Sequence, residues 1–451
     1  MPRVLVIAYF FPPVGGVGIE RTLKHVAYLP EHRWQPVVVT VAGSGYRIVD
    51  PATEARVPAG VEVHRAGTFE PAHLRRALGR LVGRRGTVPS ASPAPGPPSG
   101  PASGAGGRLR AVANRVWGGV IPLLFFPDDQ ALWARGATRV ALRVHAAEPV
   151  AAVYSSSPPI SGHLAAERVA RRTGLPWIAD FRDPWIGNAF ARPLNPLHRR
   201  IQQRLEARIV AGADRVVVST AGMREQFADR YPARADRIVH IPNGYDPVDL
   251  QVAAAERGDD GTFRLTYAGS LHAMSELDLF LDGLQLLLDR RPEVRGRLRV
   301  DFVGWFSAAN QAIAERRFPA LQPVVRQVGF VPRDRAIGLQ RASDAGLVII
   351  SGTGNRGVVA TSKIYEYLGL DLPVLAVVPP GEVRQILGGL DWGVVADPTP
   401  EGVADGLERI MELPSEHRTA DPERRYERRT LSAALAHLLD QVTEGTEPGA
   451  Q

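Results

Sequence analysis

The chain has 451 residues, of which 45% are hydrophobic and 22% charged, proportions typical of a soluble globular protein with two domains or more. It contains no cysteine, which excludes disulfides, thiolate metal sites and thiol catalysis. The formal net charge of +7 fits an anionic partner such as a nucleotide, a nucleic acid or a lipid surface. A general bias toward arginine explains the charge equally well, because the only lysines are Lys24 and Lys363.

The N-terminal region predicts a strand, a glycine-rich loop and a helix. The apolar run at residues 4–10 is typical of a central parallel strand, and it has no cleavage site of the kind that follows a signal peptide. The loop after it contains Gly15 and Gly16, where backbone can approach a phosphate or a sugar closely. The spacing matches neither the dinucleotide fingerprint nor the P-loop. A second strand is expected at residues 35–41.

A different composition follows. Apolar residues recur at helical spacing over residues 71–85 with arginines between them, which predicts a basic amphipathic helix. Such a helix either lies on an anionic membrane or is a solvated surface helix. Residues 87–107 are rich in Pro, Ser, Gly and Ala and predict a low-complexity insertion, at about 86–108, inside the first domain.

The apolar stretch at residues 116–126 is too short to span a bilayer and contains Pro122. We therefore expect a cytoplasmic protein that can contact the inner face of the plasma membrane peripherally.

Polar side chains follow two further predicted strands. A strand at residues 150–154 leads into a helix with His163 in its first turn. The next strand runs into Asp180, Arg182 and Asp183. Because ligands of an open parallel sheet bind beyond the carboxyl ends of its strands, we expect a catalytic cluster of His163, Arg182 and Asp183 there.

Two structural alternatives stay open for this cluster. Asp183 has Pro184 directly after it, a pattern that also fits the N-cap of a helix. His163 is equally compatible with an ordinary helix residue.

The strand-helix alternation restarts in the second half of the chain, after a boundary in residues 247–262. A strand at residues 264–268 ends in Gly269 and Ser270, and further strands are expected around residues 301–304, 325–330 and 345–350. We therefore expect a second α/β domain at residues 262–425, after a first at residues 1–247.

The most informative stretch is residues 360–368. Thr361 and Ser362 are N-cap candidates for a short helix, whose N-terminal N–H groups and partial positive charge suit a diphosphate. Lys363 adds a full positive charge, and Glu366, one turn later, can accept hydrogen bonds from ribose hydroxyls. For Glu366 the alternative is simple compensation of the helix dipole. A buried strand follows at residues 372–378.

These motifs, in this order, resemble the GT-B glycosyltransferases, and most of all the retaining, nucleotide-sugar-dependent enzymes of family 4. The resemblance implies two doubly wound, Rossmann-like domains facing across a cleft, with a C-terminal helix at about residues 426–445 that crosses back to the N-terminal domain. The motifs that carry it are Phe11-Pro-Pro-x-Gly-Gly16, Asp180-Phe-Arg-Asp-Pro-Trp185, Pro242-Asn-Gly-Tyr-Asp246, Tyr267-Ala-Gly-Ser270 and Ser362-Lys-x-x-Glu-Tyr-Leu368.

The resemblance also assigns roles. It implies that Glu366 binds the ribose and that Ser362 and Lys363 lie beside the donor diphosphate, with Gly269 and Ser270 in the same site. Gly15 and Gly16 match the loop that approaches donor and acceptor. The acceptor, a glycan, a lipid-linked sugar or a small molecule, is expected near His163 and Asp183. No cofactor or metal is expected besides the donor.

The chain departs from the family pattern at two places. Val358 stands where the family often has a first glutamate, and the cation usual after the Gly-Ser pair is missing, so that His272 or Arg356 would have to contribute. These departures keep two alternatives open, a degenerate nucleotide-sugar-binding or membrane-associated regulatory protein and a nucleotide-sugar epimerase. Nucleic-acid binding fits least, because aromatic residues are not interleaved with the arginine-rich segments.

Overall fold

The structure is a computed structural model. It describes residues 1–43, 49–70, 126–188, 193, 195–257, 261–271, 276–350, 360–388, 390, 392–413 and 420–444. The predicted basic helix, the low-complexity insertion, residues 116–125, His272, Arg356 and Val358 all lie outside the described residues. The chain divides into two compact units. The first comprises residues 1–219, 223–241 and 431–451, and the second residues 220–222 and 242–430.

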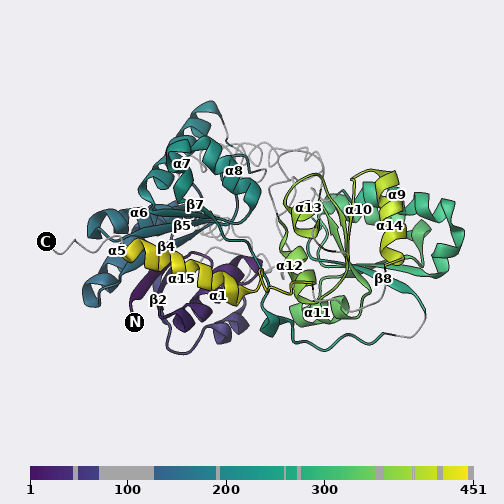
Figure 1. Cartoon of the computed structure of the whole chain (residues 1–451), viewed down its shortest axis with the longest axis horizontal. Helices are drawn as coiled ribbons and strands as arrows, with labels where there is room; N and C mark the ends of the chain where they lie inside the picture. Colours follow the sequence, from purple (N-terminus) through teal and green to yellow (C-terminus); the bar gives the residue numbers. More distant parts are fainter. Residues whose placement is uncertain are drawn as a thin grey trace, which may run out of the picture. The chain divides into compact units, whose positions relative to one another are not determined.

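The first unit is built on a seven-stranded parallel sheet with the strand order β3-β2-β1-β4-β5-β6-β7 (Figure 1). Its strands are β1 (Arg3–Ile7), β2 (Gln35–Ala42), β3 (Glu62–Gly67), β4 (Ala152–Ser157), β5 (Trp177–Phe181), β6 (Arg215–Val218) and β7 (Ile238–His240). Its helices are α1 (Glu20–Tyr28), α5 (Ala131–Ala147), α6 (Ser161–Thr173), α7 (Pro196–Gly212), α8 (Ala221–Arg230), which begins in the second unit, and α15 (Arg428–Glu444).

The second unit has a six-stranded parallel sheet with the order β10-β9-β8-β11-β12-β13. Its strands are β8 (Phe263–Ala268), β9 (Leu298–Val303), β10 (Val325–Gly329), β11 (Ala345–Ile349), β12 (Val374–Val377) and β13 (Gly393–Ala396). Its helices are α9 (Leu277–Arg290), α10 (Ala308–Arg317), α11 (Arg333–Arg341), α12 (Ser362–Gly369), α13 (Glu382–Leu387) and α14 (Pro400–Met411).

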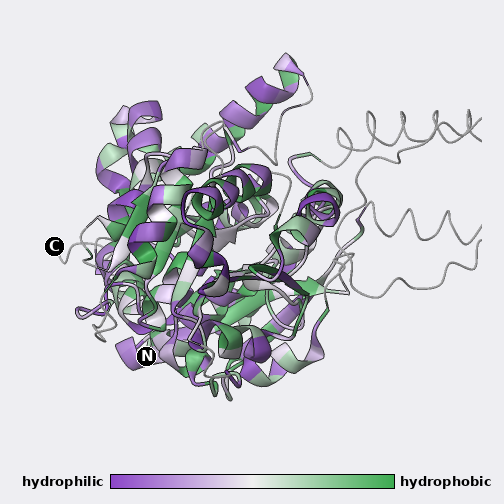
Figure 2. Ribbon diagram, turned by 90° about the vertical axis from the view of Figure 1, so that its right-hand side faces the viewer, coloured by the Kyte–Doolittle hydropathy of each residue, from purple (hydrophilic) through white to green (hydrophobic). Residues whose placement is uncertain are grey.

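The central strands of both sheets are apolar runs of residues, and helices cover both faces of each sheet. β1, β5 and β11 are buried at every residue, as expected of central parallel strands. The sheets are coloured mostly hydrophobic, whereas hydrophobic and hydrophilic residues alternate along the covering helices (Figure 2). The predicted doubly wound α/β class with two Rossmann-like units is therefore confirmed.

The last helix, α15, packs into the core of the first unit through Leu431, Leu435 and Leu439. Two polar contacts hold it there. The His25 Nδ1 atom lies 2.9 Å from the Ser432 hydroxyl, and the Trp34 indole N–H donates to Asp440 at 2.8 Å. The chain thus returns to its first unit at the end. Among the helices of the described residues, none combines the length and the apolar character that a bilayer crossing needs.

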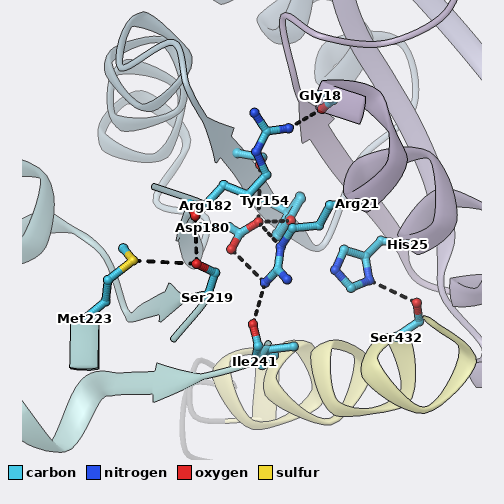
Figure 3. Close-up of polar contacts among 11 residues, drawn as sticks. Gly18, Arg21, His25, Tyr154, Asp180, Arg182, Ser219, Met223, Ile241 and Ser432 are labelled. Carbon is cyan, nitrogen blue, oxygen red and sulfur yellow. Dashed lines mark hydrogen bonds and ion pairs between the residues drawn. The ribbon is translucent and has the colours of Figure 1, made fainter. Parts of the chain in front are cut away.

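A fully buried ion pair joins the helix after the glycine-rich loop to the middle of the first sheet. Arg21 of α1 contacts both carboxylate oxygens of Asp180 at 2.8 and 2.9 Å, and its guanidinium also donates to the Ile241 carbonyl at 3.0 Å (Figure 3). Tyr154 and Ser156 of β4 donate to the same carboxylate at 2.6 and 3.2 Å. Burial opposes ionisation, but Arg21 and these donors keep the pKa of Asp180 below its ordinary value.

We expect Asp180→Asn to lower the free energy of unfolding by about 3–5 kcal/mol, because it leaves the Arg21 guanidinium buried without its counter-charge. Asp278→Asn is the matched control, since it removes a half-exposed carboxylate paired with Arg316 and Arg317, a change worth about 1 kcal/mol at most. Urea denaturation followed by tryptophan fluorescence measures both. Equal losses in the two variants would show that the buried pair has no special weight.

Candidate functional site

The candidate donor site lies where the strand order of the second sheet reverses, between β8 and β11. Ligands of doubly wound sheets bind at such a switch point, beyond the carboxyl ends of the strands. Gly269 and Ser270 follow β8 directly, and α12 is the first described helix after β11. The structure therefore brings the two halves of the predicted donor motif to one edge of one sheet.

Glycines lie at the ends of the strands along this edge of the sheet. Gly269, Gly304 and Gly329, at the ends of β8, β9 and β10, have φ values of +127°, +132° and +80°. The Gly269 N–H donates to Val303 and the Gly304 N–H to Gly329, both at 2.8 Å. A Cβ on Gly304 would lie 2.2 Å from the Gly269 carbonyl oxygen. The close backbone contact thus requires glycine at position 304, which sequence reasoning did not include in the site.

The Lys363 side chain lies against Gly269 and the Tyr267 ring at this edge. Its Nζ lies 4.7 Å from the centre of the Tyr267 ring, a cation–π contact, and Tyr267 is buried. A Cβ added to Gly269 would meet Lys363 Cε at 2.6 Å and Nζ at 3.0 Å. Gly269 is therefore the residue that lets the ammonium lie directly over the end of β8. Sequence reasoning named Gly269 and Lys363 separately and did not predict the contact of Lys363 with the Tyr267 ring.

Helix α12 presents its N-terminus at the same place. Thr361 is the N-cap, in an extended conformation, and its hydroxyl accepts a hydrogen bond from the Lys363 N–H at 3.4 Å. Ser362 is exposed at the first helical position. The buried Tyr367 ties the helix to β8, because its hydroxyl donates to the Thr266 carbonyl at 2.9 Å and accepts from the Ala268 N–H at 3.2 Å. The helix dipole and Lys363 together favour an anion here.

Glu366 faces a partner that sequence reasoning missed. Its Oε1 accepts a hydrogen bond from Arg333, at the start of α11, at 2.8 Å. Among the described residues no hydrogen bond reaches the other oxygen, Oε2, and the side chain remains 20% exposed. Arg333 thus holds one carboxylate oxygen in place and leaves the second able to accept hydrogen bonds from a diol. Pro332 before Arg333 marks a helix start, but no local pattern indicates the contact across 33 residues.

In the first unit His163 is fully buried. Its Nδ1 lies 2.8 Å from the Ser155 hydroxyl, which accepts a hydrogen bond from the Trp177 indole at 2.8 Å. Burial lowers the pKa of His163 to about 3, so the imidazole is neutral at physiological pH. A catalytic role for His163 stays a prediction, and its burial fits the alternative of an ordinary helix residue, because the rings of Trp177 and Phe181 lie close to the imidazole.

Arg182 and Asp183 lie beyond the end of β5, partly exposed. The Arg182 guanidinium donates to the Gly18 carbonyl in the loop after β1, and Ser219 donates to the Arg182 carbonyl at 2.7 Å (Figure 3). The structure thus joins Arg182 to the glycine-rich loop that holds Gly15 and Gly16. No helix starts at Pro184 in the described residues, so the N-cap alternative for Asp183 is wrong.

Asp128 is a further carboxylate at this edge of the first sheet that sequence reasoning missed. It accepts hydrogen bonds from the N–H groups of Ser161, at 2.9 Å, and Gln130, at 3.1 Å, and so caps α6 from a distant segment. Burial raises its pKa to about 6, although these hydrogen bonds oppose the shift. A carboxyl group with that pKa can exchange a proton near neutral pH.

We expect Gly304→Ala to lower the melting temperature well beyond Gly329→Ala. Each change lowers the free energy of unfolding by about 1–3 kcal/mol, because the backbone at both positions is in a conformation unfavourable to an L side chain. Only the first adds a clash with a carbonyl oxygen, since a Cβ on Gly329 meets nothing within 4 Å. Calorimetry of the two variants makes the comparison, and equal shifts would argue against the tight backbone contact.

His163 also predicts a pH dependence. The unfolded imidazole titrates at its ordinary pKa of about 6.5, whereas the folded one titrates at about 3. The unfolded state therefore binds more protons between these values, and stability falls as pH drops through that window, by up to about 1.4 kcal/mol per pH unit. Denaturation at pH 7, 6, 5 and 4 should show a shallower fall for His163→Gln. His437→Gln, which removes an exposed imidazole of α15, should retain the wild-type slope.

Comparisons with known proteins agree with this architecture. Residues 80–244 match the family model described as glycosyl transferase 4-like domain. A D-inositol 3-phosphate glycosyltransferase of Nocardiopsis dassonvillei is 27% identical over 262 residues, which cover 54% of this chain and 59% of the relative. The match thus spans little more than half of that relative.

Two solved structures share the whole fold. An α,α-trehalose 6-phosphate synthase of Burkholderia multivorans aligns with a TM-score of 0.62 at 16% identity, over 99% of this chain and 100% of that chain. HepE of Anabaena, in complex with UDP-glucose, aligns with a TM-score of 0.53 at 14% identity, over 99% of this chain and 98% of that chain. The chain is therefore a GT-B protein, similar to family 4 of the glycosyltransferases, with a glycosyl transferase 4-like domain at residues 80–244.

Proposed function

We propose that the protein is a glycosyltransferase that moves a sugar from a nucleotide-diphosphate sugar to an acceptor hydroxyl. The observation that carries this proposal is the ammonium of Lys363, held over Gly269 beside the N-terminus of α12 at the switch point. The relatives that match are glycosyltransferases, and HepE was solved with UDP-glucose in place, which supports a nucleotide-sugar donor.

In this proposal the donor diphosphate lies against Lys363 and the backbone N–H groups at the start of α12. Glu366 accepts hydrogen bonds from the ribose through Oε2 while Arg333 holds Oε1. As the bond to the sugar breaks, negative charge grows on the departing diphosphate. The fixed ammonium and helix N-terminus stabilise that charge without reorganising, which lowers the barrier.

We further propose a retaining, metal-independent reaction. A donor phosphate oxygen would take the proton of the acceptor hydroxyl as it attacks from the face that the diphosphate leaves, so no carboxylate nucleophile is required. Lys363 and the helix dipole supply the positive charge that a metal would otherwise provide. Arg182, Asp183 and the loop of Gly15 and Gly16 are the candidates for contacting a glycan, lipid-linked or small-molecule acceptor.

A cytoplasmic location with peripheral contact to an anionic membrane completes the proposal. Two alternatives differ from it in what they predict. A degenerate binding protein takes up the donor without hydrolysis or transfer, and an epimerase turns over the sugar without any acceptor.

The donor site is tested by thermal shift and titration with nucleotide diphosphates and their sugar conjugates. Lys363→Met should weaken binding of the best ligand about 10- to 100-fold, because it removes a charge-assisted contact worth about 1.5–3 kcal/mol. Glu366→Gln should weaken the binding of nucleotides but leave the binding of inorganic pyrophosphate unchanged. Lys24→Met removes the other lysine of the chain, on α1, and should bind as wild type does.

A wild-type protein that binds none of these ligands would refute the donor assignment. Unchanged affinity in Lys363→Met and Glu366→Gln would refute the site while leaving the donor class standing.

A further inference from the structure

Arginines dominate three neighbouring helices of the first unit. Helices α5, α6 and α7 pack against β3, β4 and β5 respectively, and α6 packs against both α5 and α7. The three helices contain ten arginines and two glutamates, Glu167 and Glu206. Glu206 is fully buried and Glu167 is 9% exposed, so little negative charge reaches the surface. We call the outer side of these three helices the arginine face.

Arg168 of α6 lies inside a cluster of like charges. Its Nη1 atom is buried and has no hydrogen-bond partner among the described residues. Burial lowers the pKa of Arg168, and repulsion from Arg208, Arg135 and Arg171 lowers it further, against the attraction of Glu167. Arg208 and Arg171 already share Glu167, at 2.9 and 3.6 Å. The arginines around Arg168 thus outnumber the carboxylate that they share.

The same face carries exposed apolar side chains. Leu132 of α5 and Leu197 and Ile201 of α7 are 39%, 65% and 37% exposed, and they are the exposed large hydrophobic residues that lie on α-helices of the described chain. Arg200 and Arg204 follow Leu197 at positions i+3 and i+7, on the same side of α7, and both are exposed. Apolar residues flanked by arginines on one helix face are typical of a helix that lies in a membrane interface.

We propose that the arginine face docks onto an anionic lipid surface, with Leu197 and Ile201 entering the headgroup region. The charge is complementary to anionic headgroups, and the exposed apolar residues distinguish a bilayer from a soluble polyanion. The inference rests on the peripheral membrane contact proposed above and gives it a surface on described helices, in addition to residues 71–85. It does not depend on which nucleotide the second unit binds.

Co-sedimentation of the full chain with vesicles of phosphatidylglycerol and phosphatidylcholine tests the surface. Wild type should bind the anionic vesicles and lose binding as salt is raised. Arg200→Gln with Arg204→Gln should weaken binding about fivefold for each charge removed. Leu197→Ser with Ile201→Ser should weaken binding to the same vesicles while keeping the salt dependence. Arg168→Gln removes one more charge from the arginine face and should also weaken binding.

Arg335→Gln with Arg409→Gln is the matched control, because it removes two exposed arginines from α11 and α14 of the second unit. It should bind vesicles as wild type does. Equal sedimentation of the arginine-face and control variants would overturn the proposal, and so would a wild type that binds inorganic polyphosphate but no vesicle.

Every variant is also melted with the best nucleotide ligand. An unchanged nucleotide shift shows that the variant is folded and that its donor site is intact, which separates a failure of the membrane proposal from a failure of the proposed transferase. If Arg168→Gln melts lower, the two α7 double variants still decide the outcome.

Discussion

The buried pair of Arg21 and Asp180 is the interaction on which the first unit depends. Leaving either charge in that interior without its partner costs several kcal/mol, so the pair ties α1 to β5. The Arg21 guanidinium also contacts the Ile241 carbonyl, directly after β7. Two residues after Asp180 the chain presents Arg182 to the glycine-rich loop. The pair thus lies next to the segment that joins β5 to the glycine-rich loop.

In the second unit, glycines rather than a buried ion pair allow the ends of the strands to pack closely. The Lys363 side chain lies over the end of β8, where a side chain at position 269 would otherwise project. Removing the side chains from positions 269 and 304 lets the backbone segments approach each other and leaves room for Lys363. The Tyr267 ring attracts the Lys363 ammonium through a cation–π contact. The contact does not neutralise the positive charge, because the ring carries no negative charge. The positive charge remains available to a diphosphate.

The arginine face and the donor site show two uses of positive charge in one arginine-rich chain. At the donor site a single lysine is held by specific contacts. On α5, α6 and α7 ten arginines accompany two glutamates, so positive charge exceeds negative charge on these helices. Arg168 lies close to three other arginines, and its buried Nη1 atom has no hydrogen-bond partner among the described residues.

The sequence alone was sufficient for the strand-helix alternation, because central parallel strands are short apolar runs and helix starts carry Thr, Ser or Pro signals. It also selected Gly269, Lys363 and Glu366, since each stands at a strand end or a helix start where ligands bind. Those features are local, and local patterns can be read along the chain.

Only the tertiary structure decided which polar residues are buried and with what they pair. The His163 ring is buried beside Trp177 and Phe181, and Asp180 forms half of a core ion pair. Arg333 on Glu366, Asp128 on α6 and the cluster around Arg168 each join residues far apart in sequence. Burial and long-range pairing depend on how elements pack, and the free energy of a charge changes by several kcal/mol with that environment.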